Sequence, residues 1–326
     1  MMTIQLPPGF TARPARPDDL QVVVDVMNAV TQADVGKSDN TPFTVGRYWD
    51  SDDVKLEADT LLIFTPEGQA AGFAQFIEDT PPTPYDVDTW VHPAYMKTGV
   101  GGALLQWIDQ RAQRALAHAP AGVPASIEHM YVYAQNRAAQ QRLEKFGYER
   151  ERVFYRMAIE FNTPPPEPQL PAGITIRSFR RGVEERALYA AFAEAQTDEW
   201  GQENPLSFDK WAYYLIEVEE NFDPEAWFLA VEGETIVGYA LCRWDRAGEP
   251  DRSTVRYLAV RRAWRKRGIA LALLQAAFGG MYRRGKRGAG LGVDATSYTG
   301  ADRLYVRAGM QRAFETLRYR KALRDA

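Results

Sequence analysis

The chain is poor in the residues from which disulfides and metal sites are built. Among its 326 residues are one cysteine, Cys242, and three histidines, His92, His118 and His129. A single cysteine excludes an internal disulfide and any site with several cysteine ligands. The histidines have no cysteine or second histidine at ligand spacing, so we expect no metal. Cys242 lies in an apolar run and is expected to be a small buried side chain.

Long apolar runs and a dominant charge are also missing. No segment is apolar over the length that a bilayer requires, and the first residues do not show the basic and apolar regions of a signal peptide. The 39 Lys and Arg against 43 Asp and Glu give a net charge of −4, without a long basic tract. This balance argues against nucleic acid as a partner. We therefore expect a cytoplasmic protein that binds neither nucleic acid nor a membrane.

The most informative segment is residues 255–270, an apolar strand that runs into a basic turn, a glycine and an amphipathic helix. Glycine lets the backbone approach an anion, and the first N–H groups and the dipole of a helix attract negative charge. The pattern therefore predicts a pyrophosphate-binding site. Its candidate residues are Leu258, Ala259, Val260, Arg265, Lys266, Arg267, Gly268, Ile269 and Ala270.

The same pattern occurs once more, earlier in the chain. Val91 precedes Gly99 by as many residues as Val260 precedes Gly268. Residues 6–13 also match 170–177, and residues 72–74 match 238–240. The spacing is 164–169 residues throughout, which indicates a duplicated domain rather than a short repeat. The candidate anion-binding residues of the first copy are Val91, Lys97, Thr98, Gly99 and Gly101.

The proline-rich segment 163–169 predicts a stiff linker between the copies. We therefore expect an N-terminal domain over residues 1–162 and a C-terminal domain over 170–326. Each copy is predicted to run strand, helices, three strands, helix, strand, helix, strand. This order is typical of an α/β fold with a mixed, mostly antiparallel sheet flanked by helices and a parallel pair of strands beside the anion-binding helix.

In element order and motif residues the chain resembles the GNAT superfamily of CoA-dependent N-acyltransferases, as two tandem domains. The family's main motif is an apolar-x-Val strand followed by Arg or Gln-x-x-Gly-x-Gly or Ala. Leu258, Val260, Arg265, Gly268 and Ala270 fulfil it. Residues 222–225 and 291–310 look most like the mycothiol synthase branch of tandem GNAT proteins, although Ser297 and Tyr298 stand where that branch has Asn-Pro.

The resemblance implies an acetyl-CoA-dependent N-acetyltransferase whose acceptor is a primary amine of a small molecule or peptide. The strand ending at Val260 would splay from its parallel neighbour, and its N–H groups would bind the pantetheine arm and polarise the thioester. Tyr305 would protonate the leaving thiolate, and Ser297 would join the cofactor-binding residues. A carboxylate base is expected near the first two helices of the second copy. Its candidates are Asp198, Glu199, Glu203, Glu217, Glu219 and Glu220, of which we prefer Glu199, beside Trp200.

The first copy departs from the motif at two positions. Leu143 stands where the second copy has Tyr305, and Met96 stands where it has Arg265. Asn136 matches a polar position of the family, so a residual CoA site stays open. We expect a catalytically silent first domain that is structural or helps to frame the acceptor site. A non-catalytic acyl-CoA-binding or sensing protein is the alternative to an enzyme, and both a monomer and a homodimer are open.

Overall fold

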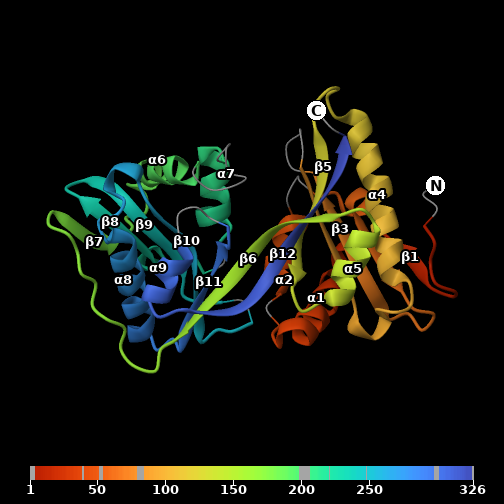
Figure 1. Ribbon diagram of the computed structural model, residues 1–326, viewed down its shortest axis with the longest axis horizontal. Helices are drawn as coiled ribbons and strands as arrows, with labels where there is room; N and C mark the ends of the chain where they lie inside the picture. Colours follow the sequence, from red (N-terminus) through yellow and green to blue (C-terminus); the bar gives the residue numbers. More distant parts are fainter. Residues whose placement is uncertain are drawn as a thin grey trace. The chain divides into compact units, whose positions relative to one another are not determined.

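A computed structural model shows two compact units (Figure 1). It describes residues 4–38, 40–50, 54–78, 84–197, 206–219, 221–246, 248–296 and 301–324. Unit 1 comprises Met1–Phe154 and Phe314–Ala326, and unit 2 comprises Tyr155–Ala313. Within the described residues no helix is both long enough and apolar enough to cross a membrane.

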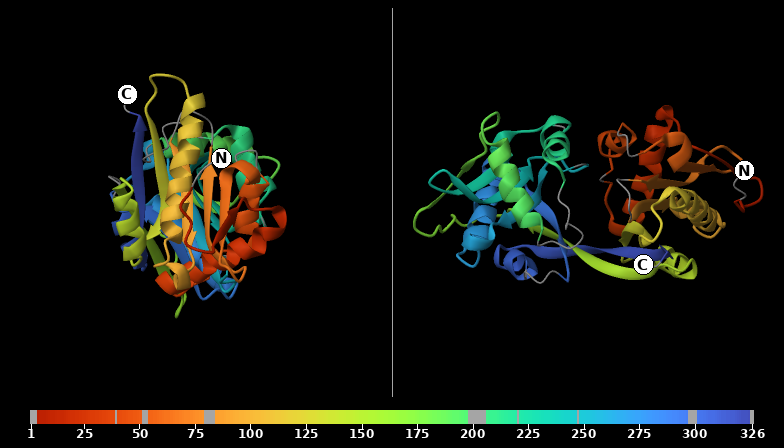
Figure 2. Two further views of the ribbon diagram at one scale, coloured as in Figure 1. Left: turned by 90° about the vertical axis from the view of Figure 1, so that its right-hand side faces the viewer. Right: turned by 90° about the horizontal axis from the view of Figure 1, so that it is seen from above.

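Unit 1 is a sheet with helices on both faces (Figures 1 and 2). The strand order is β1 (Thr11–Arg13), β2 (Thr60–Phe64), β3 (Ala70–Ile77), β4 (Tyr85–Val91), β5 (Ala125–Tyr133) and β12 (Gln311–Arg324). The helices are α1 (Leu20–Val35), α2 (Pro42–Trp49), α3 (Leu56–Asp59), α4 (Val100–His118) and α5 (Arg137–Lys145). Successive residues of β3 point to opposite faces of the sheet. A Cβ on Gly72 would touch Val100 and Leu104, so α4 covers one face. Phe73 packs with buried residues of α1, which covers the other face.

Unit 2 repeats this arrangement. Its strand order is β6 (Glu149–Glu160), β11 (Gly288–Asp294), β10 (Arg252–Val260), β9 (Thr235–Arg243), β8 (Trp227–Glu232) and β7 (Ile174–Ser178). The helices are α6 (Glu185–Gln196), α7 (Phe208–Ala212), α8 (Ile269–Arg283) and α9 (Ala301–Arg307). A Cβ on Gly238 of β9 would touch Leu273 of α8, whereas the ring of Tyr239 stacks on Phe192 of α6. The two helices therefore cover opposite faces.

The expected α/β class is confirmed. In unit 1 the β4–β5 pair is parallel, and in unit 2 the β10–β11 pair is parallel. The other registered pairs, such as β3–β4 and β8–β9, are antiparallel. In unit 2, α7 ends at Ala212 and a π-helical turn, Tyr213–Glu217, follows it directly.

The chain passes from one unit to the other within β6 and again within β12. The last strand of the second sequence copy, β12, pairs with β5 of unit 1, where it buries Leu317 and Tyr319. The end of the first copy belongs to unit 2: Phe161 donates its N–H to the Arg287 carbonyl and packs on Phe278. The linker expected at 163–169 separates the sequence copies, whereas the compact units exchange the final strand of each copy.

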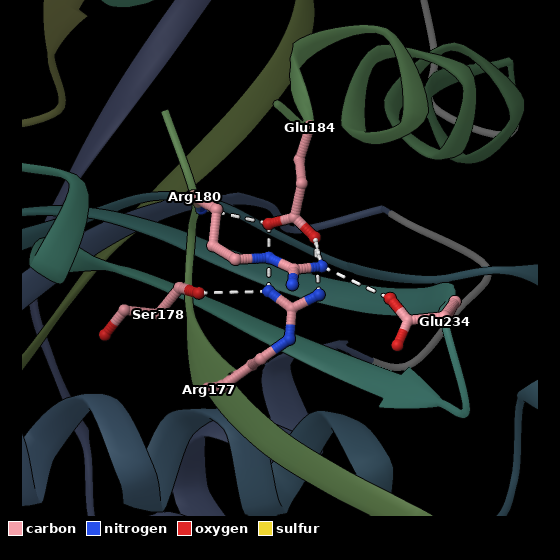
Figure 3. A network of polar contacts seen from close by, with 5 residues as sticks. All are labelled: Arg177, Ser178, Arg180, Glu184 and Glu234. Carbon is pink, nitrogen blue, oxygen red and sulfur yellow. Dashed lines mark hydrogen bonds and ion pairs between the residues drawn. The ribbon is translucent and has the colours of Figure 1, made fainter. Parts of the chain in front are cut away.

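A buried carboxylate holds the first strand of unit 2 to its first helix (Figure 3). Glu184, directly before α6, accepts hydrogen bonds from both Arg177 guanidinium nitrogens on β7, one of them at 2.9 Å. It also accepts from the Arg180 backbone N–H at 2.9 Å and from the Arg180 guanidinium at 2.7 Å. Arg180 reaches Glu234 in the β8–β9 turn at 3.3 Å. Three elements are thus joined around one carboxylate.

Candidate functional site

The basic turn between β10 and α8 lies where the strand ends at Val260. Arg265 donates from Nε to the Val260 carbonyl at 2.9 Å, so the turn folds back on the strand. Lys266 adopts a φ of 62°, and Gly268, the N-cap residue of α8, has a φ of 85°. A Cβ on Gly268 would meet nothing within 4 Å. Gly268 is therefore required for its backbone conformation, and the space above it is open to a ligand.

The parallel pair β10–β11 separates before the end of β10. Among the described residues it is registered only from Arg252 opposite Gly288 to Thr254 opposite Gly290. On its other edge β10 stays paired with β9 as far as Val260 opposite Gly238. The edge of Leu258–Val260 that faces β11 is thus left without a strand partner, so its N–H groups are available to another acceptor. This is the opening that the cofactor-binding prediction requires.

Tyr305 lies on α9, which packs against α8, and is 8% exposed within the core of unit 2. The structure thus brings Tyr305 to the helix that begins at the basic turn. Ser297 and Glu199 lie outside the described residues, as do Asp198, Glu203 and Glu220. The roles that we predict for these residues and for the basic turn stay predictions.

A small cavity in unit 2 lies between the π-helical turn after α7 and the strands β8, β9 and β10, and the sequence alone did not predict it. Glu219 lies in its wall with 5% of the side chain exposed, and its carboxylate is ion-paired with Arg243 at 2.8 Å and with Arg256. Tyr257 and Phe222 add aromatic surface. Glu219 was one of six equivalent carboxylates in the sequence. Its partners could not be assigned because they come from two strands whose register the sequence leaves open.

The corresponding opening in unit 1 is bridged by a histidine. The parallel pairing of β4 and β5 ends at Val87 opposite His129. The His129 ring then accepts the Thr89 backbone N–H at Nε2, 3.1 Å away, and lies 2.8 Å from the Thr89 hydroxyl. Leu143, which replaces the tyrosine of the second copy, is 2% exposed. A strand N–H that faces the opening between the strands is thus already occupied in unit 1.

The predicted anion-binding residues of the first copy lie together at the start of α4. Gly99 is the N-cap residue with a φ of 101°, Val91 ends β4, and Gly101 lies in the first turn of the helix. Thr98 turns its hydroxyl to the Tyr95 carbonyl at 2.7 Å, and the Lys97 side chain is exposed. Unit 1 therefore keeps the backbone conformation of the glycine turn, although His129 bridges the two strands beside this turn. Anion binding by these residues stays a prediction.

Comparison with known proteins identifies one family in both sequence copies. The model of the acetyltransferase (GNAT) family matches residues 29–148 and 186–310. The mycothiol acetyltransferase of Salinispora arenicola is 30% identical, over 96% of this chain and 98% of the relative. The mycothiol acetyltransferase of Thermobispora bispora is 27% identical, over 94% and 97% of the two chains.

Solved structures agree with these matches. The GCN5-related N-acetyltransferase from Sphaerobacter thermophilus superimposes with a TM-score of 0.84 at 36% identity, over 99% of this chain and 98% of the other. A tandem GNAT protein from the clavulanic acid biosynthesis pathway has a TM-score of 0.72 at 14% identity, over 97% and 99% of the chains. The second likeness concerns the fold alone.

Proposed function

The chain belongs to the acetyltransferase (GNAT) family, whose acyl donor is acetyl-CoA, and we propose that unit 2 is its catalytic centre. The chain is thus an N-acetyltransferase, and its acceptor is a primary amine of a small molecule or peptide. The observation that carries this assignment is the difference between the two openings. The end of β10 is open toward β11, whereas the matching opening in unit 1 is bridged by His129.

Donor binding is assigned to the basic turn and the end of β10. The pyrophosphate lies against the first N–H groups of α8, where the open space over Gly268 and the positive end of the helix favour an anion. Arg265, Lys266 and Arg267 add positive charge there. The N–H groups of Leu258–Val260 donate to the pantetheine arm and to the thioester oxygen, where charge develops during attack.

In the transfer step the amine nitrogen bonds to the thioester carbonyl carbon and the carbon–sulfur bond breaks. Tyr305 gives its phenolic proton to the departing sulfur, and a carboxylate takes the proton that the amine loses. We keep Glu199 as the proposed base. Glu219 is a weaker choice because its carboxylate already neutralises Arg243 and Arg256.

The experiment is release of free thiol from acetyl-CoA over a panel of amines, together with calorimetric titration of CoA. Gly268→Val is expected to weaken CoA binding at least about tenfold, because valine at this φ distorts the turn and projects toward the phosphate groups. Gly285→Val is the matched control: Gly285 also has a positive φ, 75°, with nothing within 4 Å of its Cβ, but lies at the other end of α8. Equal CoA affinity in the two variants would show that the pyrophosphate does not bind at the turn before α8.

A further inference from the structure

A cavity in unit 1 between β4, β5 and α5 is lined by hydrogen-bond donors without acceptors. Its polar lining comprises Asp34, Thr89, His129, Asn136 and Arg142. In the part of the chain that the structure describes, the guanidinium of Arg142 has no hydrogen-bond or ion-pair partner. Nδ1 of His129 and Nε1 of Trp90, which also lines the cavity, are buried and unpartnered. Buried donors without acceptors are uncommon in folded proteins, so these groups point to an acceptor other than the described residues of the chain.

Arg142 lies in an electrostatically unfavourable place. The three atoms nearest to a Cβ built on Gly101 all belong to its guanidinium, so this cation packs on the first turn of α4. A 19-residue helix carries partial positive charge at that end. Burial lowers the pKa of Arg142, and no carboxylate compensates for the burial. An anion beside the guanidinium would remove both costs.

His129 supplies the second donor. Its side chain is 3% exposed, and Nε2 accepts the Thr89 N–H, which leaves the ring proton on Nδ1. Burial, and then the charge of Arg142, lower the pKa of His129 to about 3, so the ring is neutral at physiological pH. Nδ1–H is therefore a neutral donor in the wall that contains Arg142.

The one carboxylate in this wall does not serve Arg142. Asp34 accepts a hydrogen bond from the Asn136 amide at 2.8 Å, and burial raises the pKa of Asp34. In unit 2 the position that matches Arg142 is Leu304, one residue before Tyr305, and it packs against the core. The polar pair of unit 1 is therefore not a remnant of the groups proposed for acyl transfer.

We propose that unit 1 contains a binding site for a small oxyanion, held by the Arg142 guanidinium, the His129 Nδ1–H and the first turn of α4. A guanidinium offers two parallel donors that match either a carboxylate or a phosphate group. The site takes such a group as a free ion or as the end of a small metabolite. It is separate from the proposed catalytic centre and does not depend on it.

The test is calorimetric titration of the full chain with inorganic phosphate and, separately, with acetate. We expect one of them to bind with a dissociation constant of about 1 mM or tighter. Arg142→Gln should weaken that binding at least about tenfold, since a charged hydrogen-bond donor is lost. Lys145→Gln removes the same charge from an exposed site on the same helix and should leave the affinity within about twofold. If only one of the two anions binds, that anion identifies the chemical group that the site prefers.

A second measurement uses the unaltered protein, so that it does not depend on the folding of a variant. The chain has three histidines, His92, His118 and His129, whose imidazole nitrogen signals can be assigned by NMR through single substitutions of His92 and His118. Addition of the anion should shift the Nδ1 signal of His129 and leave the other two in place. Failure of both anions to bind below 10 mM, equal binding by Arg142→Gln, or an unmoved His129 signal would overturn the proposal. None of these outcomes bears on thiol release by unit 2.

Discussion

Among single residues, Tyr305 is distinguished by its combination of chemistry and burial. It is 8% exposed in the core of unit 2, yet it lies on the short helix that packs on α8, whose N-cap residue is Gly268. A phenol, with an ordinary pKa of about 10, stays protonated at neutral pH and can donate to a thiolate whose conjugate acid titrates near about 8.5. The ring fills core space whether or not the hydroxyl is present.

Tyr305→Phe is therefore expected to fold and to bind CoA as the unaltered chain does. Its kcat should fall by about 10²–10⁴-fold, because the proton donor is lost while the packing is kept. KM should change much less than kcat. Steady-state kinetics with acetyl-CoA and a responsive amine measure both constants. A variant with full turnover would show that water or another side chain protonates the sulfur.

At this scale the sequence predicts the residues whose role is set by local conformation. Gly99 and Gly268 both have positive φ at helix starts, as the strand–turn–helix pattern predicts. The pairing of His129 with Thr89 and the isolation of Arg142 could not be predicted. Each depends on the register of two strands or on the approach of two helices, and neither is encoded within a few residues of chain.

Among the elements, the junction of first strand and first helix is built alike in both units. In unit 1, Arg13 on β1 makes two hydrogen bonds to Asp19, at 2.6 and 2.8 Å, just before α1. In unit 2, Arg177 on β7 binds Glu184 in the same place. Arg13 and Arg177 are matched positions of the sequence repeat. The repeat therefore preserves an ion pair that fixes how the first helix leaves the sheet.

Glu184→Gln is expected to lower the free energy of unfolding by about 1–3 kcal/mol at neutral pH, since buried hydrogen bonds to charged groups are lost. Burial alone would raise the pKa of Glu184, but the hydrogen bonds from Arg177 and Arg180 outweigh it and lower the pKa to about 2. The ionised carboxylate therefore stabilises the fold fully above pH about 4.5, and this stabilisation is lost as the pH falls toward 2.

Chemical unfolding at a series of pH values measures this dependence. Between pH 4.5 and 2 the unaltered chain should lose the stabilisation that the Glu184 carboxylate provides. Glu184→Gln has no such carboxylate, so its free energy of unfolding should fall less over this range. Glu234→Gln is the control, because Glu234 is 91% exposed at 3.3 Å from Arg180 and should change stability by less than about 0.5 kcal/mol. If both variants behaved alike, the burial of Glu184 would have no energetic consequence.

The strands and helices follow one another in the order that the sequence predicts for each copy, from β1 to β6 and from β7 to β12. The partner of a strand is less accessible to such reasoning. The apolar pattern of β12 predicts a strand, but it carries no information on which sheet the strand joins. The exchange of β6 and β12 between the two units was therefore not predicted.

For the molecule as a whole, this exchange means that neither sequence copy contains a complete unit. A chain ending at Ala313 lacks the part of β12 that buries Leu317 and Tyr319 in unit 1. Removal of large core side chains costs about 2–5 kcal/mol each, so unit 1 should be strongly destabilised. Hydrogen exchange should become faster in β4 and β5, while a chain ending at Arg324 should exchange as the full chain does. Unchanged protection of β5 in the shorter chain would show that β12 is dispensable.

We expect acetyl transfer in unit 2 and none in unit 1. Three glycine variants separate a loss of activity from a loss of stability. Gly268→Val, Gly99→Val and Gly285→Val each place a branched side chain at a positive φ, where the protein leaves space for its Cβ. Each should cost about 1–3 kcal/mol. Gly101 is unsuitable because a Cβ there would collide with Arg142.

Only Gly268→Val should abolish acetyl transfer, because Gly268 alone of the three lies at a turn next to an open pair of strands and on the unit that contains Tyr305. Gly99→Val alters the matching turn in unit 1, where His129 already takes the Thr89 N–H and Leu143 replaces the tyrosine. Its turnover should stay within a few-fold of the unaltered chain once thermal melts show that the protein is folded. Loss of turnover in folded Gly99→Val, with turnover kept in Gly268→Val, would place catalysis in unit 1 instead.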